Sequence, residues 1–136
     1  MMNFVYSKVA SLDGKPKVGT KDCVALVQHY AHAPNHLAWR PGEKVLDNKT
    51  IRPGTAIATF ENGRYPSRPK GNHAALYLRP GPSGDGFWVI DQWKDDTTKK
   101  TISSRYIPSR HQPQHKDGTW YRASDNADAF YVIETR

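Results

Sequence analysis

Three residues of this sequence could together perform nucleophilic chemistry: one cysteine, one histidine and one aspartate. Cys23 is the single cysteine among 136 residues; His73 lies 50 residues after it, and Asp91 another 18 residues on. A thiolate can attack a carbonyl carbon, an imidazole can take and return the proton, and a carboxylate can hold the imidazole in the required tautomer. These residue types predict a cysteine hydrolase, provided that the fold brings them together.

The segment around Cys23 is typical of the start of a helix. We expect this helix over residues 20–33, with Thr20 as its N-cap after Gly19 and with Pro34 at its end. Cys23 would then lie in the first turn, where the helix dipole and free N–H groups lower the pKa of a thiol. The alternative interpretation is a buried cysteine that acts only as a small hydrophobic side chain.

His73 and Asp91 are expected at the ends of two neighbouring strands. His73 begins an apolar stretch, residues 73–78, and Asp91 lies toward the end of another, residues 86–93. If these strands pair antiparallel through the short loop between them, His73 and Asp91 lie side by side at one end of the sheet. A structural histidine and a turn-capping aspartate are the alternatives.

The remaining chain predicts an α+β fold in which the helix packs against an antiparallel sheet of about four to six strands. We expect further strands at residues 55–60 and 130–133 and a turn with an aromatic anchor at residues 39–45. Residues 94–125 are polar and predict loops, with one short strand around Ile102. We expect residues 1–136 to form a single domain.

Composition narrows the possible functions. One cysteine excludes an internal disulfide framework and a multi-cysteine zinc site. No apolar segment predicts a signal peptide or membrane insertion, so we expect synthesis in a cytoplasm. The net charge of +7 favours an anionic partner, although a merely basic surface would give the same value. The positive charges are scattered, and no nucleic-acid-binding motif is present, so we expect no nucleic-acid partner.

Several short motifs resemble those of known cell-wall hydrolases. The segment DCVALV around Cys23 and the segment GNHAALYL around His73 resemble the nucleophile and histidine motifs of NlpC/P60 and CHAP peptidoglycan amidases. The segments GTAIATF, NHAALYL and VIDQW, in this order, resemble the BPSL0067 family more closely, and that family is similar to type VI secretion amidase effectors. The resemblance covers about residues 19–93.

This resemblance implies a papain-like fold and hydrolysis of an amide bond in the peptide stems of peptidoglycan, with no metal or cofactor. It implies that Cys23 is the nucleophile and that His73 is the general base and then the general acid. Asp91 falls at the position of the third, orienting residue, and the adjacent Gln92 is its rival. Because side chains alternate along a strand, only one of the two can face His73; an aspartate stabilises an imidazolium better.

The resemblance also implies a biological role. We expect an antibacterial effector carried by a type VI secretion component into the periplasm of a target bacterium, with a cognate immunity protein that protects the producer. The alternatives are a phage or housekeeping cell-wall hydrolase and a non-catalytic binding module on a papain-like scaffold. The basic loop at residues 64–70 could contact the acidic stem peptide or could simply be solvated.

Overall fold

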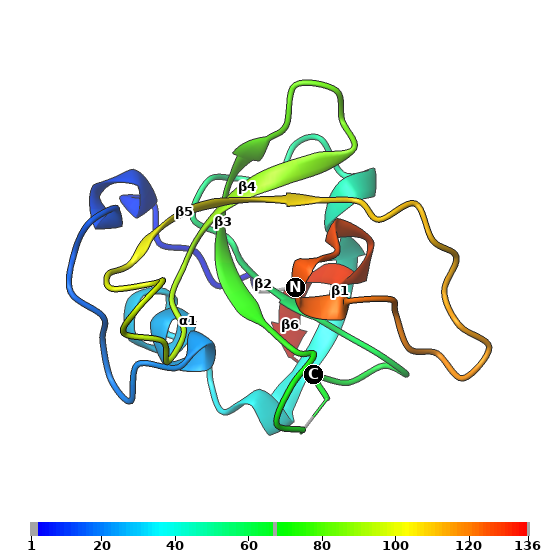
Figure 1. Ribbon diagram of the computed structural model, residues 1–136, viewed down its shortest axis with the longest axis horizontal. Coiled ribbons are helices and arrows are strands. Elements are labelled where there is room, and N and C mark those ends of the chain that lie inside the picture. The colour runs from blue at the N-terminus through cyan, green and yellow to red at the C-terminus, as the bar shows by residue number, and fades with distance from the viewer. Residues whose placement is uncertain (1–2, 67, 136) are drawn as a thin grey trace.

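The computed structural model describes residues 3–66 and 68–135, and it has one α-helix beside a six-stranded sheet (Figure 1). The α-helix is α1, Cys23–Ala31. The strands are β1 Trp39–Lys44, β2 Ala56–Thr59, β3 Ala74–Pro80, β4 Gly86–Asp91, β5 Ser103–Pro108 and β6 Phe130–Thr135. The short 3₁₀ helices are η1 Val9–Leu12, η2 His36–Ala38, η3 Val45–Asp47, η4 Ala123–Asp125 and η5 Ala127–Ala129. The predicted α+β class is confirmed.

The sheet has the strand order β1-β6-β2-β3-β4-β5, and every neighbouring pair is antiparallel. Strands β2 to β5 form an antiparallel meander. Helix α1 packs against β3 on one face of the sheet, where Leu26 and Leu76 are buried. The opposite face has its own core around Phe87 and Phe130. Since side chains alternate along β3, the strand supplies both cores.

One prediction about the sheet was wrong. Residues 39–45 do not form a turn: β1 pairs with β6, and Trp39 is fully buried within that pair. Pro41 and Gly42 are unusual in a strand, but β1 lies at the sheet edge and carries a bulge, where both residues are tolerated. The short strand predicted around Ile102 corresponds to β5, which begins at Ser103 and pairs with β4 along its whole length.

The start of α1 also differs from the prediction. Asp22, not Thr20, is the N-cap: its Oδ1 accepts a hydrogen bond from the Ala25 N–H at 2.8 Å. Thr20 instead donates its hydroxyl proton to the other Asp22 oxygen. The helix ends at Ala31 because His32 adopts the left-handed conformation, with φ 60°. No helix of the described residues is long and apolar enough to cross a membrane.

Candidate active site

Cys23 is the first residue of α1 and lies in an open cleft. Its side chain is half-buried and forms no disulfide. The cleft, of about 410 Å³, is also lined by His73, Tyr65 and Trp93. The helix start therefore presents the thiol to solvent-accessible space rather than sealing it in the core.

His73 and Asp91 meet as the antiparallel pairing predicted. His73 directly precedes β3, Asp91 ends β4, and these two strands pair in antiparallel register. The His73 Nε2 lies 2.8 Å from the Asp91 Oδ2. Both side chains are buried, and Asp91 is fully inaccessible to solvent.

Gln92 faces away from His73 and holds the segment before α1. Its side-chain amide donates to the carbonyl oxygens of Asp22, at 2.7 Å, and Val18, at 3.1 Å. Its Oε1 accepts from the Val18 N–H at 3.0 Å. Asp91 and Gln92 are adjacent, so strand alternation directs one to the histidine and the other to the backbone that leads into Cys23.

Tyr65 is a site residue that the sequence did not reveal. Its hydroxyl oxygen lies 3.7 Å from the Cys23 Sγ. It comes from the basic loop at residues 64–70, where no periodic pattern indicates which side chain reaches Cys23. Its ring is buried against Trp39 and His36, with centroid distances of 5.0 Å and 5.6 Å.

Two cations on the far side of Asp91 were also missed. Lys99 Nζ lies 2.7 Å from the Asp91 Oδ1, an ion pair without hydrogen-bond geometry. Arg105, from β5, donates its Nε–H to the Asp91 Oδ2 at 2.9 Å and a second N–H to Asp125. Both cations also lie over the Trp93 ring. One buried carboxylate is thus shared by His73, Lys99 and Arg105.

The electrostatics of this cluster favour a charged thiol. Burial opposes ionisation of Cys23, but the positive charge of His73 and hydrogen bonding from His73 and Tyr65 outweigh it, so the pKa of the thiol is lowered. Burial also raises the pKa of the Tyr65 hydroxyl, and the Cys23 charge raises it further. The tyrosine therefore stays protonated and can donate to the sulfur.

The same interactions act in the opposite sense on His73. Burial would lower the pKa of its imidazole, but Cys23 and Asp91 outweigh burial and raise the pKa from 6.5 to about 9. Burial would raise the pKa of Asp91, but the hydrogen bond and charge of His73 and the charges of Arg105 and Lys99 hold it well below its usual value. A thiolate–imidazolium pair beside an ionised aspartate is the favoured state near neutral pH.

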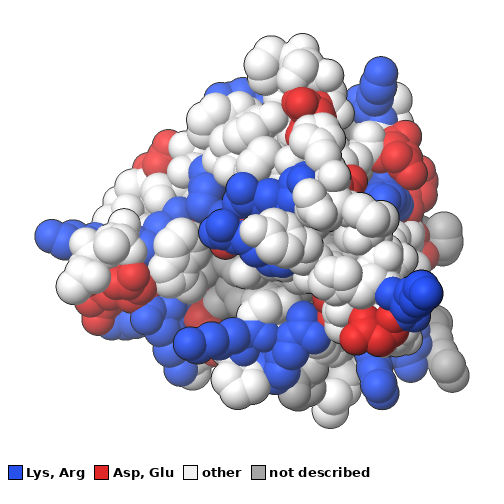
Figure 2. Space-filling view, turned by 45° about the vertical axis from the view of Figure 1, so that its right-hand side comes forward, with Lys and Arg blue, Asp and Glu red and all other residues white. Residues whose placement is uncertain are grey.

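Figure 2 shows a face of the molecule on which Lys and Arg side chains are more numerous than Asp and Glu. Within residues 3–66 and 68–135, no group of three or more His, Cys, Asp or Glu side chains is placed to hold a metal ion.

Comparisons with known proteins agree on one family. Residues 3–133 match the family model described as Domesticated amidase effector 2. A curated "Type VI secretion amidase effector 2 protein" from Salmonella typhi is 45% identical over 135 residues, which are 98% of this chain and 100% of that protein. A solved structure of "Type 6 secretion amidase effector 2 (Tae2)" matches with a TM-score of 0.92 and 44% identity, covering 98% of this chain and 95% of that one. The chain belongs to the domesticated amidase effector 2 family.

Proposed function

We propose that this protein is a cysteine amidase that cleaves an amide bond in the peptide stems of peptidoglycan and acts as a type VI secretion effector against other bacteria. The observation that carries the proposal is the arrangement of Cys23, His73 and Asp91. A thiol at a helix start faces an imidazole, and the imidazole is held by a buried carboxylate at 2.8 Å. The amidase family supports the reaction class.

In the proposed reaction, the Cys23 thiolate attacks the carbonyl carbon of the stem peptide. Asp91 engages Nε2 of His73, which leaves Nδ1 for the sulfur and for the leaving group. The imidazolium gives its proton to the departing amine, and a thioester remains on Cys23. His73 then takes a proton from water as the water oxygen attacks the thioester carbonyl carbon. The carbon–sulfur bond breaks, the carboxylic acid product leaves, and the Cys23 thiolate and the His73 imidazolium are restored.

The start of α1 can stabilise the negative charge that develops on the substrate carbonyl oxygen during the attack. The Asp22 side chain caps the Ala25 N–H, so the N–H groups of Cys23 and Val24 remain without an intrahelical partner. These donors and the positive end of the helix dipole stabilise an oxyanion beside the sulfur. Gln92 contributes indirectly, because its hydrogen bond fixes the Asp22 carbonyl immediately before Cys23.

Digestion of purified sacculi tests the enzymatic part of the proposal. We expect the wild-type protein to release new muropeptides, identified by chromatography and mass spectrometry as products of amide hydrolysis. Cys23→Ala and His73→Ala should release none, while Arg79→Gln, on the exposed end of β3, should match the wild type. A Cys23→Ala variant that cuts as well as the wild type would remove cysteine catalysis.

Production inside a test bacterium examines the proposed place of action. With a periplasmic export signal attached, the protein should lyse the cell; without the signal, it should be tolerated, because peptidoglycan lies outside the cytoplasmic membrane. The Cys23→Ala variant should be harmless in both cases. We also propose a cognate immunity protein that covers the Cys23 cleft, and its co-production in the periplasm should prevent lysis.

A further inference from the structure

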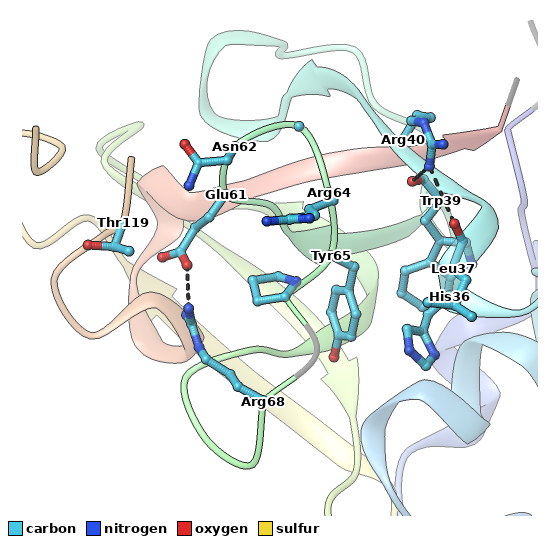
Figure 3. A pocket seen from close by; sticks show the side chains of 12 residues that line it. His36, Leu37, Trp39, Arg40, Glu61, Asn62, Arg64, Tyr65, Arg68 and Thr119 are labelled. Carbon is cyan, nitrogen blue, oxygen red and sulfur yellow. Dashed lines mark hydrogen bonds and ion pairs between the residues drawn. The ribbon is translucent and has the colours of Figure 1, made fainter. Parts of the chain in front are cut away.

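A second and larger pocket adjoins the Cys23 cleft. Its volume is about 710 Å³, against about 410 Å³ for the cleft. Four residues line both, namely His36, Tyr65, Pro66 and Arg68, so the two pockets are adjacent. Tyr65 and His36 stand edge to face at the junction, with ring centroids 5.6 Å apart (Figure 3). A substrate bound at Cys23 can therefore extend past Tyr65 into this pocket.

The pocket has a surplus of positive charge. Its one acidic lining residue, Glu61, is buried and fully engaged: Arg68 donates to one oxygen at 2.6 Å, and the Trp120 N–H donates to the other at 2.8 Å. Arg40 is held at the rim by the carbonyl oxygens of Trp39 and Leu37 (Figure 3). After Arg68 neutralises Glu61, the charges of Arg40 and Arg64 remain.

Arg64 is the cation best placed to bind a ligand. Its side chain is exposed and forms no ion pair with the described part of the chain, and Figure 3 shows it inside the ring of lining residues. Its backbone is held by two hydrogen bonds with Glu61 across a tight turn in which Asn62 and Gly63 both have positive φ. The backbone of Arg64 is thus fixed to the turn, while its guanidinium is available to a ligand.

We propose that this pocket is a substrate subsite in which Arg64 binds a free carboxylate of the peptide whose amide bond lies at Cys23. This inference rests on the proposed amidase function. An arginine fork matches a carboxylate in shape and charge, and the contact is stronger than a hydrogen bond between neutral groups. The subsite would thus make free stem carboxylates, rather than amidated ones, the preferred substrate class.

A comparison of two substrates and two variants tests the subsite. Soluble muropeptides are cleaved before and after chemical conversion of their free carboxylates to amides. We expect the wild type to lose at least tenfold in kcat/KM on amidation. Arg64→Gln should lose about tenfold on the free-carboxylate substrate, mainly through KM, and less than about twofold on the amidated one, as expected for loss of a charge-assisted contact. On the free-carboxylate substrate, the kcat/KM of Arg64→Lys should lie between those of the wild type and Arg64→Gln, and the kcat/KM of Arg79→Gln should match that of the wild type.

The possible outcomes separate the two proposals. If the wild type cleaves but Arg64→Gln is unchanged, or falls equally on both substrates, the subsite is wrong and the amidase proposal stands. If the wild type cleaves neither substrate, the amidase proposal fails. Calorimetric titration of the inactive Cys23→Ala protein with both muropeptides then tests the subsite separately. Tighter binding of the free-carboxylate muropeptide, abolished when Arg64→Gln is added, would support the subsite. Equal binding of the two muropeptides would overturn it.

Discussion

The two sides of the His73 ring differ in exposure to solvent and in the charged groups that they hold. On one side Cys23 and Tyr65 border an open cleft. On the other side Asp91 is completely buried and contacts two cations, Lys99 and Arg105. The open side can admit a substrate and change its protonation during a reaction. The closed side keeps one negative charge that solvent cannot reach.

This difference explains why a carboxylate can be buried beside the proposed base. An isolated ionised aspartate in a protein interior would be unstable unless it were paired. The hydrogen bond and charge of His73, together with the charges of Arg105 and Lys99, supply that pairing, so Asp91 remains ionised. The closed side therefore fixes the tautomer of His73, and the open side holds Cys23 and Tyr65.

Removing the charge of Asp91 should break this arrangement most severely. Asp91→Asn keeps the size of the side chain but cannot stabilise an imidazolium, and we expect turnover to fall by roughly one to four orders of magnitude. Lys99 and Arg105 would lose their shared partner, so the melting temperature should also fall. The measurement is muropeptide release, with circular dichroism at the assay temperature to establish that the variant is folded.

Asp125→Asn is the matched control for that experiment. Asp125 also pairs with Arg105, but it is partly exposed and does not contact His73. We expect less than about threefold loss, as for other exposed ion pairs. A folded Asp91→Asn enzyme with full activity would show that the closed side does not orient His73.

The pH dependence of activity should show the coupling between the two sides. Because the pKa of His73 is raised from 6.5 to about 9, the imidazolium persists through neutral pH and is lost as pH rises through about 9. We expect kcat/KM to fall about tenfold per pH unit above that point. At the acid end, activity should fall as the thiolate is protonated, at a pH below the ordinary thiol pKa of 9.0.

Alkylation by iodoacetamide measures the thiolate directly, because the thiolate is the reactive form. The wild type should already react rapidly at pH 7, and His73→Ala should react more slowly there. A wild-type alkylation rate that rises in a single step centred near 9.0, the ordinary thiol pKa, would contradict the ion pair.

Loss of the Tyr65 hydroxyl should have a smaller effect, on the open side alone. Tyr65→Phe removes one donor to the sulfur at 3.7 Å, a long contact, while its ring keeps its packing against Trp39. We expect a threefold to tenfold fall in kcat/KM, since such a contact contributes about 1 kcal/mol. The alkylation profile should move to higher pH. An unchanged profile would mean that the hydroxyl does not stabilise the thiolate.

The closed side shows how far the sequence could predict the site. Antiparallel pairing of two strands with a short connection was enough to place His73 beside Asp91, and alternation was enough to separate Asp91 from Gln92. Lys99 and Arg105 lie in a polar segment without regular alternation. Arg105 reaches Asp91 because β5 pairs with β4, and Lys99 reaches it from the loop before β5. Such contacts depend on tertiary pairing and leave no local pattern.

The open side was predictable only in part. A helix start near Cys23 follows from capping and helix rules, although the N-cap is Asp22 rather than the predicted Thr20. Both residues are good caps, and only the backbone conformation, with Asp22 extended and Lys21 at positive φ, decides between them. Tyr65 reaches Cys23 through a loop whose path no periodicity specifies.

Neutralising Lys99 should shift the pH profile with little change in rate. Lys99→Met keeps an apolar side chain against Trp93 and removes a buried positive charge from the Asp91 cluster. Arg105 still holds the Asp91 Oδ2, so His73 keeps its orientation. With one cation fewer, the imidazolium is easier to maintain, and the His73 pKa rises.

We therefore expect the alkaline limb of kcat/KM to move to higher pH by up to about one unit, with less than about threefold change at pH 7. Lys100→Met, at the neighbouring exposed position, is the matched control and should leave the limb in place. If the alkaline limb moves to lower pH instead, Lys99 helps Asp91 to stabilise the imidazolium of His73 and does not destabilise it by charge repulsion. The closed side would then act through geometry more than through charge.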